Sequence, residues 1–139
     1  MKFLLDTNVW IDFLNGRFPS VTRRISDTDP TELRLSSIVS AELRYGAEKS
    51  QQPETNHKKL DLLFSEVGIL EFDEEAARVF GVIRKTLEAQ GLPIGPFDML
   101  IAAHAKSRNL ILVSDNTREF SRVDGIQLEN WRLAPEALS

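Results

Sequence analysis

Four acidic side chains stand next to expected strands and helices, where binding sites are commonly built: Asp6, Glu42, Asp98 and Asp115. Asp6 directly follows an apolar run at residues 3–5, and Asp115 comes just after another at residues 110–113. Short apolar runs of this kind predict buried strands. Because parallel central strands end at the same edge of a sheet, we expect Asp6 and Asp115 to lie close together.

Glu42 and Asp98 are expected in two helices. Glu42 shares a predicted helix face with Ile38 and Tyr45, which is an unusual setting for a solvated charge, and Asp98 lies in the first turn of a helix opened by Pro96. Four converging carboxylates repel one another unless a cation lies among them. A hard divalent ion such as Mg²⁺ or Mn²⁺ takes oxygen ligands, activates a water molecule and polarises a phosphodiester.

Each of these residues also has an ordinary explanation when taken alone. Asp6 and Asp98 suit helix capping or the favourable dipole at a helix start. Asp115 followed by Asn116 is a good turn pair, and Glu42 suits a surface ion pair. The combination favours a metal site, because independent capping does not require all four at one edge of a sheet.

The elements that must position these residues alternate between strands and helices. Strands are predicted at residues 3–5, 33–35, 69–72 and 110–113, and helices at about 9–14, 38–45, 60–67, 76–87 and from 96 onward. Such alternation predicts a central, mainly parallel sheet covered on both faces, which is an α/β fold. In these folds the site lies beyond the carboxyl ends of the strands.

Length and composition narrow the function further. The 139 residues suit one domain, and the net charge of −4 has the wrong sign for a protein held to nucleic acid by overall charge. The absence of cysteine excludes disulfides, zinc–thiolate sites and thiol nucleophiles. We find no signal peptide and no membrane-spanning run, so we expect a cytoplasmic protein. The sequence patterns of serine hydrolases, P-loop nucleotide-binding enzymes and dinucleotide-binding enzymes are missing.

Four short segments in order carry a resemblance to a known family: LLDTN at residues 4–8, SAEL at 40–43 with Tyr45-Gly46, GPFD at 95–98 and VSDNTREF at 113–120. With these segments, and with the closing residues 128–131, the chain resembles PIN-domain ribonucleases along almost its whole length. It is most similar to VapC toxins of bacterial type II toxin–antitoxin pairs, in the branch that cleaves initiator tRNA. The resemblance implies a single PIN domain over residues 1–139 with a three-layer α/β/α sandwich.

The resemblance also implies roles for individual residues. Asp6, Glu42 and Asp98 correspond to the acidic triad that holds Mg²⁺ and the attacking water. The fourth acidic position of the family is Asn116 here, and an amide adds no charge. This departure argues against a tightly held second metal, and Asp115 and Glu119 are the nearby carboxylates that would compensate.

Substrate and partners follow from the same resemblance. Arg118 and Arg122, which follow the last motif, are the best candidates for binding RNA phosphates. The expected substrate is tRNA cut near the anticodon, and the expected partners are a VapB-like antitoxin and a second copy of the chain, in a toxin–antitoxin hetero-oligomer. Two alternatives remain: a non-catalytic module that binds RNA or antitoxin through a degenerate site, suggested by Asn116, and a metal-dependent DNase on the same scaffold.

Overall fold

The computed structural model describes residues 2–133 of the chain. Within that range the strands are β1 (Phe3–Leu5), β2 (Leu33–Ser36), β3 (Ile69–Leu70), β4 (Ile111–Val113) and β5 (Gln127–Glu129). The helices are α1 (Thr7–Leu14), α2 (Pro19–Asp27), α3 (Ser37–Glu48), α4 (Pro53–Glu66), α5 (Glu74–Ala89), α6 (Pro96–Ser107) and α7 (Thr117–Phe120), with a 3₁₀ turn at Pro30–Glu32. Met1 and residues 134–139, which belong to the predicted domain of 1–139, lie outside the described residues.

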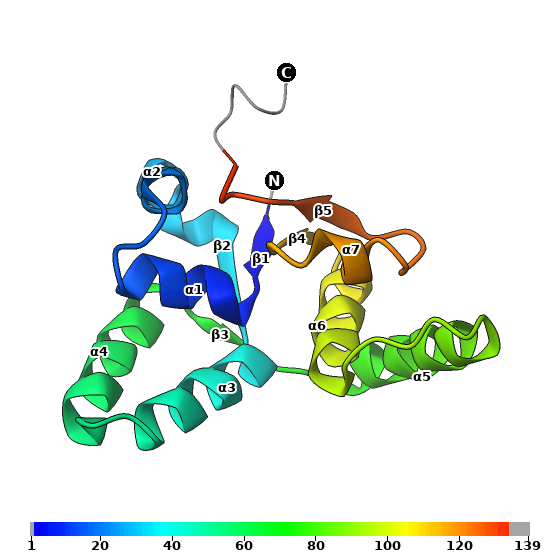
Figure 1. Cartoon of the computed structure of the whole chain (residues 1–139), viewed down its shortest axis with the longest axis horizontal. Coiled ribbons are helices and arrows are strands. Elements are labelled where there is room, and N and C mark those ends of the chain that lie inside the picture. The colour runs from blue at the N-terminus through cyan, green and yellow to red at the C-terminus, as the bar shows by residue number, and fades with distance from the viewer. Residues whose placement is uncertain (1, 134–139) are drawn as a thin grey trace.

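The strands form one sheet in the order β3-β2-β1-β4-β5, and each neighbouring pair is parallel. In register, Leu4 of β1 lies opposite Arg34 of β2 and Leu112 of β4. Right-handed crossovers place the helices that lead towards β3 on one face and those that lead back towards β5 on the other. Figure 1 shows this division, with α1–α4 left of the strands and α5–α7 right of them. The predicted three-layer α/β/α sandwich is confirmed.

The core lies between the sheet and these two helical layers. Leu4 and Leu5 of β1 and Leu112 of β4 are fully buried, as expected for central strands of a parallel sheet covered on both faces. Trp10 of α1 and Trp131 after β5 are the largest buried side chains of the described part. Burial of such aromatic side chains contributes much of the hydrophobic stabilisation. The core therefore fixes the ends of β1 and β4, from which two of the acidic residues project.

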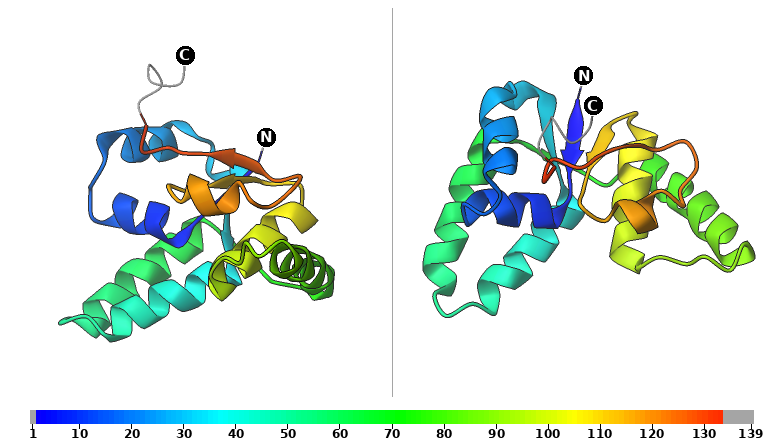
Figure 2. Two further views of the ribbon diagram at one scale, coloured as in Figure 1. Left: turned by 45° about the vertical axis from the view of Figure 1, so that its right-hand side comes forward. Right: turned by 45° about the horizontal axis from the view of Figure 1, so that its top comes forward.

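The helix that carries Glu42 faces the core differently from the sequence prediction. Val39, Leu43 and Ala47 are its buried residues, whereas Tyr45 is 67% exposed. The prediction was wrong because α3 carries two overlapping apolar stripes, and the stripe spaced by four residues packs inward. Glu42 lies beside that stripe and is half-buried. Figure 2 shows α3 and α4 packed against each other as neighbouring helices below the sheet.

Several elements at the edges of the sheet were absent from the prediction. The helices α2 and α7 and the strand β5 have short or weakly apolar sequences, and the predicted strand 69–72 is ordered as a strand only at Ile69–Leu70. Edge strands of two or three residues give little periodic signal. No described helix is long and apolar enough to cross a membrane.

Candidate active site

The predicted site lies where the direction of the sheet's connections reverses. From β1 the chain moves to β2 on one side, and it later returns to β4 on the other side of β1. The backbone N–H of Asp6 donates to the carbonyl oxygen of Val113 at 2.9 Å, so the two strand ends are held together. Open α/β sheets bind their ligands at such a switch point, beyond the carboxyl ends of the strands.

A cavity of about 320 Å³ opens at this point. Its lining residues come from the segments after β1 and β4, from the starts of α1 and α6 and from the middle of α3: Asp6, Thr7, Asn8, Glu42, Asp98, Asp115 and Asn116. The structure therefore brings four acidic side chains, separated by up to 109 positions in the sequence, to one cavity. Their convergence requires the parallel strand order and could not follow from local capping alone.

Asp6 is the most buried of these carboxylates, with 6% of its surface exposed. It caps α1 by accepting from the backbone N–H of Thr7 at 2.8 Å, and its other oxygen accepts from the Ser114 hydroxyl at 2.8 Å. Burial raises the pKa of Asp6, and the negative charges of Glu42 and Asp115 raise it further, while the two hydrogen bonds oppose the change. The net effect is a fixed carboxylate whose negative charge is costly without a cation.

Glu42 reaches the cavity from α3 and is held there by a residue of α1. The Thr7 hydroxyl donates to Oε1 of Glu42 at 2.8 Å. Thr7 thus offers its backbone N–H to Asp6 and its hydroxyl to Glu42. This one residue fixes the spacing of two carboxylates, a role that the sequence prediction missed.

Asp98 lies in the first turn of α6, two residues after Pro96. Its pKa is raised from 3.8 to about 6, first by burial and then by the negative charges of Asp6, Glu119 and Glu42. A carboxyl group with such a pKa is a candidate functional group, because ordinary surface carboxylates do not behave in this way. Burial therefore makes the ionised form of Asp98 costly, and the neighbouring carboxylates add to that cost.

Asn116 stands between two of the carboxylates. Its side-chain amide donates to Oδ2 of Asp98 at 3.3 Å and to Oε2 of Glu119 at 3.0 Å, while its backbone N–H donates to the Ser114 hydroxyl. An acidic residue here would add a charge, whereas the amide donates hydrogen bonds to Asp98 and Glu119. Glu119 acts on the cavity through this amide and through its charge, and it is not among the residues that line the cavity.

Asp115 lines the cavity but is paired with a basic residue that the sequence analysis did not single out. Its Oδ2 accepts from Nη1 of Arg132 at 2.9 Å, and the same guanidinium binds the buried Asp12. Asp115 therefore contributes less uncompensated charge than the other three carboxylates. No local sequence signal indicates this pairing, since Asp115 and Arg132 come from different elements.

The donor set fits a hard divalent cation. Carboxylate and amide oxygens line the cavity. Burial, with a smaller contribution from neighbouring carboxylates, raises the pKa values of Asp6 and Asp98, and a bound cation would stabilise their ionised forms. Within residues 2–133, no three or more His, Cys, Asp or Glu side chains form a ready-made metal cluster. Mg²⁺ usually binds directly to only a few carboxylates, and water molecules complete its coordination shell.

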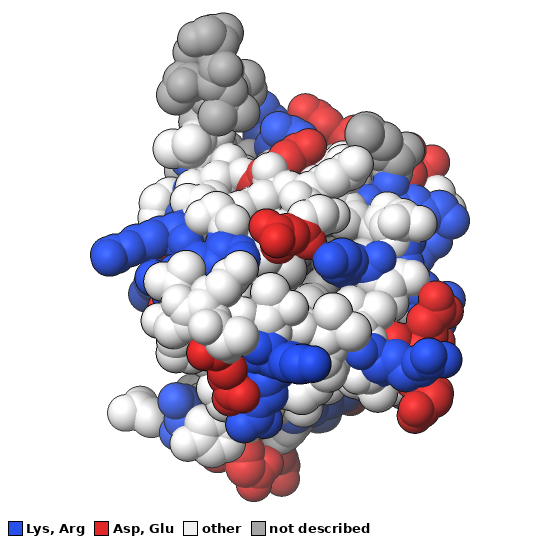
Figure 3. Space-filling model, turned by 90° about the vertical axis from the view of Figure 1, so that its right-hand side faces the viewer, with Lys and Arg blue, Asp and Glu red and all other residues white. Residues whose placement is uncertain are grey.

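The two predicted phosphate-binding arginines lie outside the cavity lining. Arg118 is exposed on α7, two residues after Asn116. Arg122 donates to the carbonyl oxygen of Pro93 at 3.1 Å, and it lines a separate hollow with Val82 and Lys106. On the side formed by α5–α7, basic side chains make several groups with acidic ones between them (Figure 3). Their role in RNA binding stays a prediction.

Comparisons with known proteins identify the family of the chain. Residues 3–126 match the PIN domain family. The chain is 45% identical over 131 residues to the tRNA(fMet)-specific endonuclease VapC of Shigella flexneri, which covers 94% of this chain and 98% of that protein.

Two solved structures share the fold along nearly the whole chain. The first is DNA-bound VapBC from Salmonella typhimurium, in which one chain is 40% identical with a TM-score of 0.88, covering 94% of this chain and 98% of that chain. The second is VapBC2 from Rickettsia felis bound to a promoter DNA fragment, with 38% identity and a TM-score of 0.87, covering 94% and 99%. By sequence and by structure, the chain belongs to the PIN domain family and, within it, to the VapC ribonucleases.

Proposed function

We propose that this protein is a Mg²⁺-dependent endoribonuclease, the toxin of a type II toxin–antitoxin pair, which hydrolyses a phosphodiester bond of tRNA. The observation that carries the proposal is the convergence of Asp6, Glu42 and Asp98 on one cavity at the switch point of the sheet. The substrate is inferred from the relative in Shigella flexneri, named as a tRNA(fMet)-specific endonuclease. We therefore propose initiator tRNA, cut near the anticodon.

Asp6, Glu42 and Asp98 are the residues that would hold the cation, with Mn²⁺ as a possible substitute for Mg²⁺. When bound, the ion supplies the positive charge that polarises a phosphodiester and lowers the pKa of a water molecule. The setting of Asp98 supports this proposal, because burial, and then the negative charges of Asp6, Glu119 and Glu42, raise its pKa to about 6. Asn116 and Glu119 stand beside Asp98 and are secondary candidates, as is Asp115.

The remaining residues of the cavity orient these carboxylates. Ser114 holds one oxygen of Asp6, Thr7 holds one oxygen of Glu42, and the Asn116 amide holds one oxygen of Asp98. Each carboxylate thereby keeps its second oxygen or a second lone pair free for a cation or for water. Fixed ligands reduce the reorganisation that the reaction requires, which is the main contribution of a preorganised site.

A toxic ribonuclease requires an inhibitor in its own cell, so we propose a VapB-like antitoxin as its partner. The solved structures of two relatives are the VapBC complex of Salmonella typhimurium and the VapBC2 complex of Rickettsia felis. We also propose homodimers of the toxin within a larger toxin–antitoxin assembly.

Cleavage of purified tRNA by the purified chain tests the proposal. Initiator tRNA and elongator methionine tRNA are incubated with the protein and Mg²⁺, with EDTA, and with EDTA followed by excess Mg²⁺. We expect cleavage of the initiator tRNA, loss of cleavage in EDTA and recovery on adding the ion. Primer extension then gives the position of the cut.

Two variants separate the site from general damage. Asp98→Asn should abolish cleavage while the circular-dichroism spectrum stays unchanged, and Asp27→Asn, an exposed acidic residue of α2, is the matched control with full activity. Cutting in EDTA, or full activity of Asp98→Asn, would refute the mechanism. Intact RNA together with RNA binding would favour a non-catalytic module, and faster nicking of supercoiled DNA would favour a DNase.

A further inference from the structure

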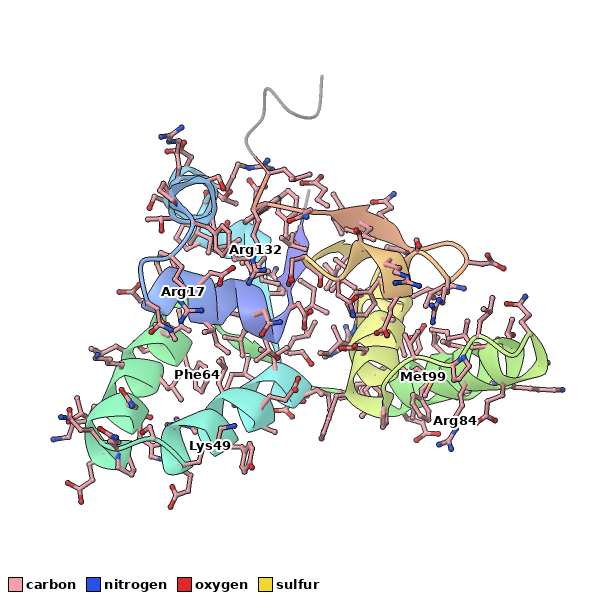
Figure 4. All side chains as sticks on the ribbon, viewed as in Figure 1. Arg17, Lys49, Phe64, Arg84, Met99 and Arg132 are labelled. Carbon is pink, nitrogen blue, oxygen red and sulfur yellow. The ribbon has the colours of Figure 1, made fainter. Side chains whose placement is uncertain are left out.

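Arg132, in the segment after β5, joins the acidic cavity to the interior of the helical layer. Its Nε and Nη2 donate to the two oxygens of Asp12 at 2.7 and 3.0 Å, and its Nη1 donates to Asp115 at 2.9 Å. This arrangement uses the planar fork of arginine to hold two carboxylates at once, which lysine cannot reproduce. Figure 4 shows Arg132 between the helices α1 and α2 and the strand β1.

The guanidinium is held in place from several sides. Asp12 is 1% exposed, so its charge requires a partner, and Arg132 supplies that partner through two hydrogen bonds. The ring of Phe18 lies 4.3 Å from the guanidinium carbon, and the Ser20 hydroxyl donates to the Arg132 carbonyl at 2.9 Å. A side chain fixed so firmly sets the position of whatever else it binds.

Asp115 is the residue that this arrangement presents to the cavity. One of its oxygens accepts from Arg132, and the other, Oδ1, is buried without a hydrogen-bond partner in the described structure. Its charge acts on the site, since it contributes to the raised pKa of Asp6.

We propose that Arg132 is a positioning residue that tunes the charge facing the acidic cavity, by holding Asp115 in place and partly offsetting its negative charge. A cavity that must attract a cation and also admit an RNA phosphate cannot carry unlimited negative charge. With Asp115 compensated, Asp6, Glu42 and Asp98 remain to attract the cation. The effect on RNA binding rests on the proposed function. The effect on cation binding does not require that the protein cleaves RNA.

The proposal predicts opposite changes in cation binding and RNA binding. In the double variant Asp12→Asn with Arg132→Gln, no unpaired charge is left in the core and Asp115 is left uncompensated. The lost positive charge contacts the cavity-lining Asp115, whereas the lost negative charge of Asp12 is outside the lining. Mn²⁺ binding to the RNA-free protein, measured by electron paramagnetic resonance, should therefore tighten severalfold, by less than the roughly tenfold effect of one whole nearby charge. The KM for tRNA should rise by about the same factor, with a smaller change in kcat.

Two further variants make the test specific. Adding Asp115→Asn to the double variant removes the negative charge that has lost its partner. The affinity for Mn²⁺ and the KM for tRNA should both return towards the wild-type values. Asp115→Asn alone leaves Arg132 paired with Asp12 and removes one negative charge from the cavity lining, so Mn²⁺ binding should weaken and the KM for tRNA should not rise. Arg84→Gln is the matched control, because Arg84 pairs with Glu88 on the exposed face of α5 and neither residue lines the cavity, so it should leave Mn²⁺ binding unchanged.

The outcomes distinguish this inference from the proposed function. Cation and RNA binding that weaken together in the double variant, or no recovery in the triple variant, would overturn the role of Arg132. If the double variant does not fold, Asp115→Asn decides, and unchanged Mn²⁺ binding would overturn the inference. Tighter Mn²⁺ binding in a protein that leaves all tRNA intact would support the charge-setting role of Arg132 and refute the proposed nuclease.

Discussion

Replacing Asp98 by asparagine should stabilise the protein while it abolishes the activity. The pKa of Asp98 is raised from 3.8 to about 6 by burial and by neighbouring carboxylates, so its ionised form is disfavoured in the folded state. A shift of that size corresponds to about 3 kcal/mol of unfavourable free energy at neutral pH. Because the group is only partly buried and solvent screens its neighbours, we expect a gain of roughly 1–2 kcal/mol from Asp98→Asn.

The sign of the effect determines its pH dependence. Well below pH 3.8, Asp98 is protonated in both the folded and the unfolded state, so it adds no penalty to folding. As the pH rises through 3.8 the unfolded chain ionises first, so folding becomes less favourable, and the full penalty is present above about pH 6. The stability advantage of Asp98→Asn should therefore be largest at pH 7–8 and should shrink towards pH 4.

Urea unfolding of both proteins in EDTA at several pH values measures this difference, and thermal unfolding at neutral pH should show a rise of roughly 4–8 °C. Added Mg²⁺ should stabilise the wild type more than the variant, because the ion binds the folded carboxylates. Asp27→Asn, the same change at an exposed position of α2, controls for the loss of one carboxylate from the chain. A variant less stable than the wild type at pH 7, or a difference independent of pH, would refute the reasoning that these carboxylates repel one another.

Three further substitutions probe the residues that orient the carboxylates. Ser114→Ala removes a hydrogen bond to the buried carboxylate of Asp6, and urea unfolding at pH 7 should show a loss of about 1.5–3 kcal/mol. Thr7→Val frees Glu42, so kcat for tRNA should fall roughly tenfold while KM changes little; an unchanged kcat would show that Glu42 needs no anchor. Asn116→Asp adds a charge beside Asp98, which should destabilise the metal-free protein in thermal unfolding and tighten Mn²⁺ binding in the same resonance assay.

The central strands and the helices between them were predictable because their signals are local. The run at residues 3–5 and the run ending at Val113 are buried strands, and Asp73 and Gly91 mark the start and end of α5 in the structure as their chemistry indicates. The inward face of α3 was not predictable, because Val39 and Tyr45 are both apolar and only packing chooses between them.

The carboxylates of the site were identified because each stands at a position that an α/β fold uses for binding. Asp6 follows a strand and Asp98 begins a helix, so the parallel topology alone implies that they approach each other. The residues that hold them were missed. Thr7 and Ser114 were within the recognised motifs, but nothing in the spacing indicates which oxygen each hydroxyl would bind.

By itself, the order of residues determined the alternation of strands and helices and the acidic character of the switch point, since both depend on neighbours along the chain. Only the tertiary structure decided the charge balance of the cavity. Arg132 meets Asp12 across 120 positions and Asp115 across 17, and Ser114 meets Asp6 across 108. Such pairs form because the packed sheet brings distant segments together, and in a low-dielectric cavity the partner of each charge determines what that charge can do.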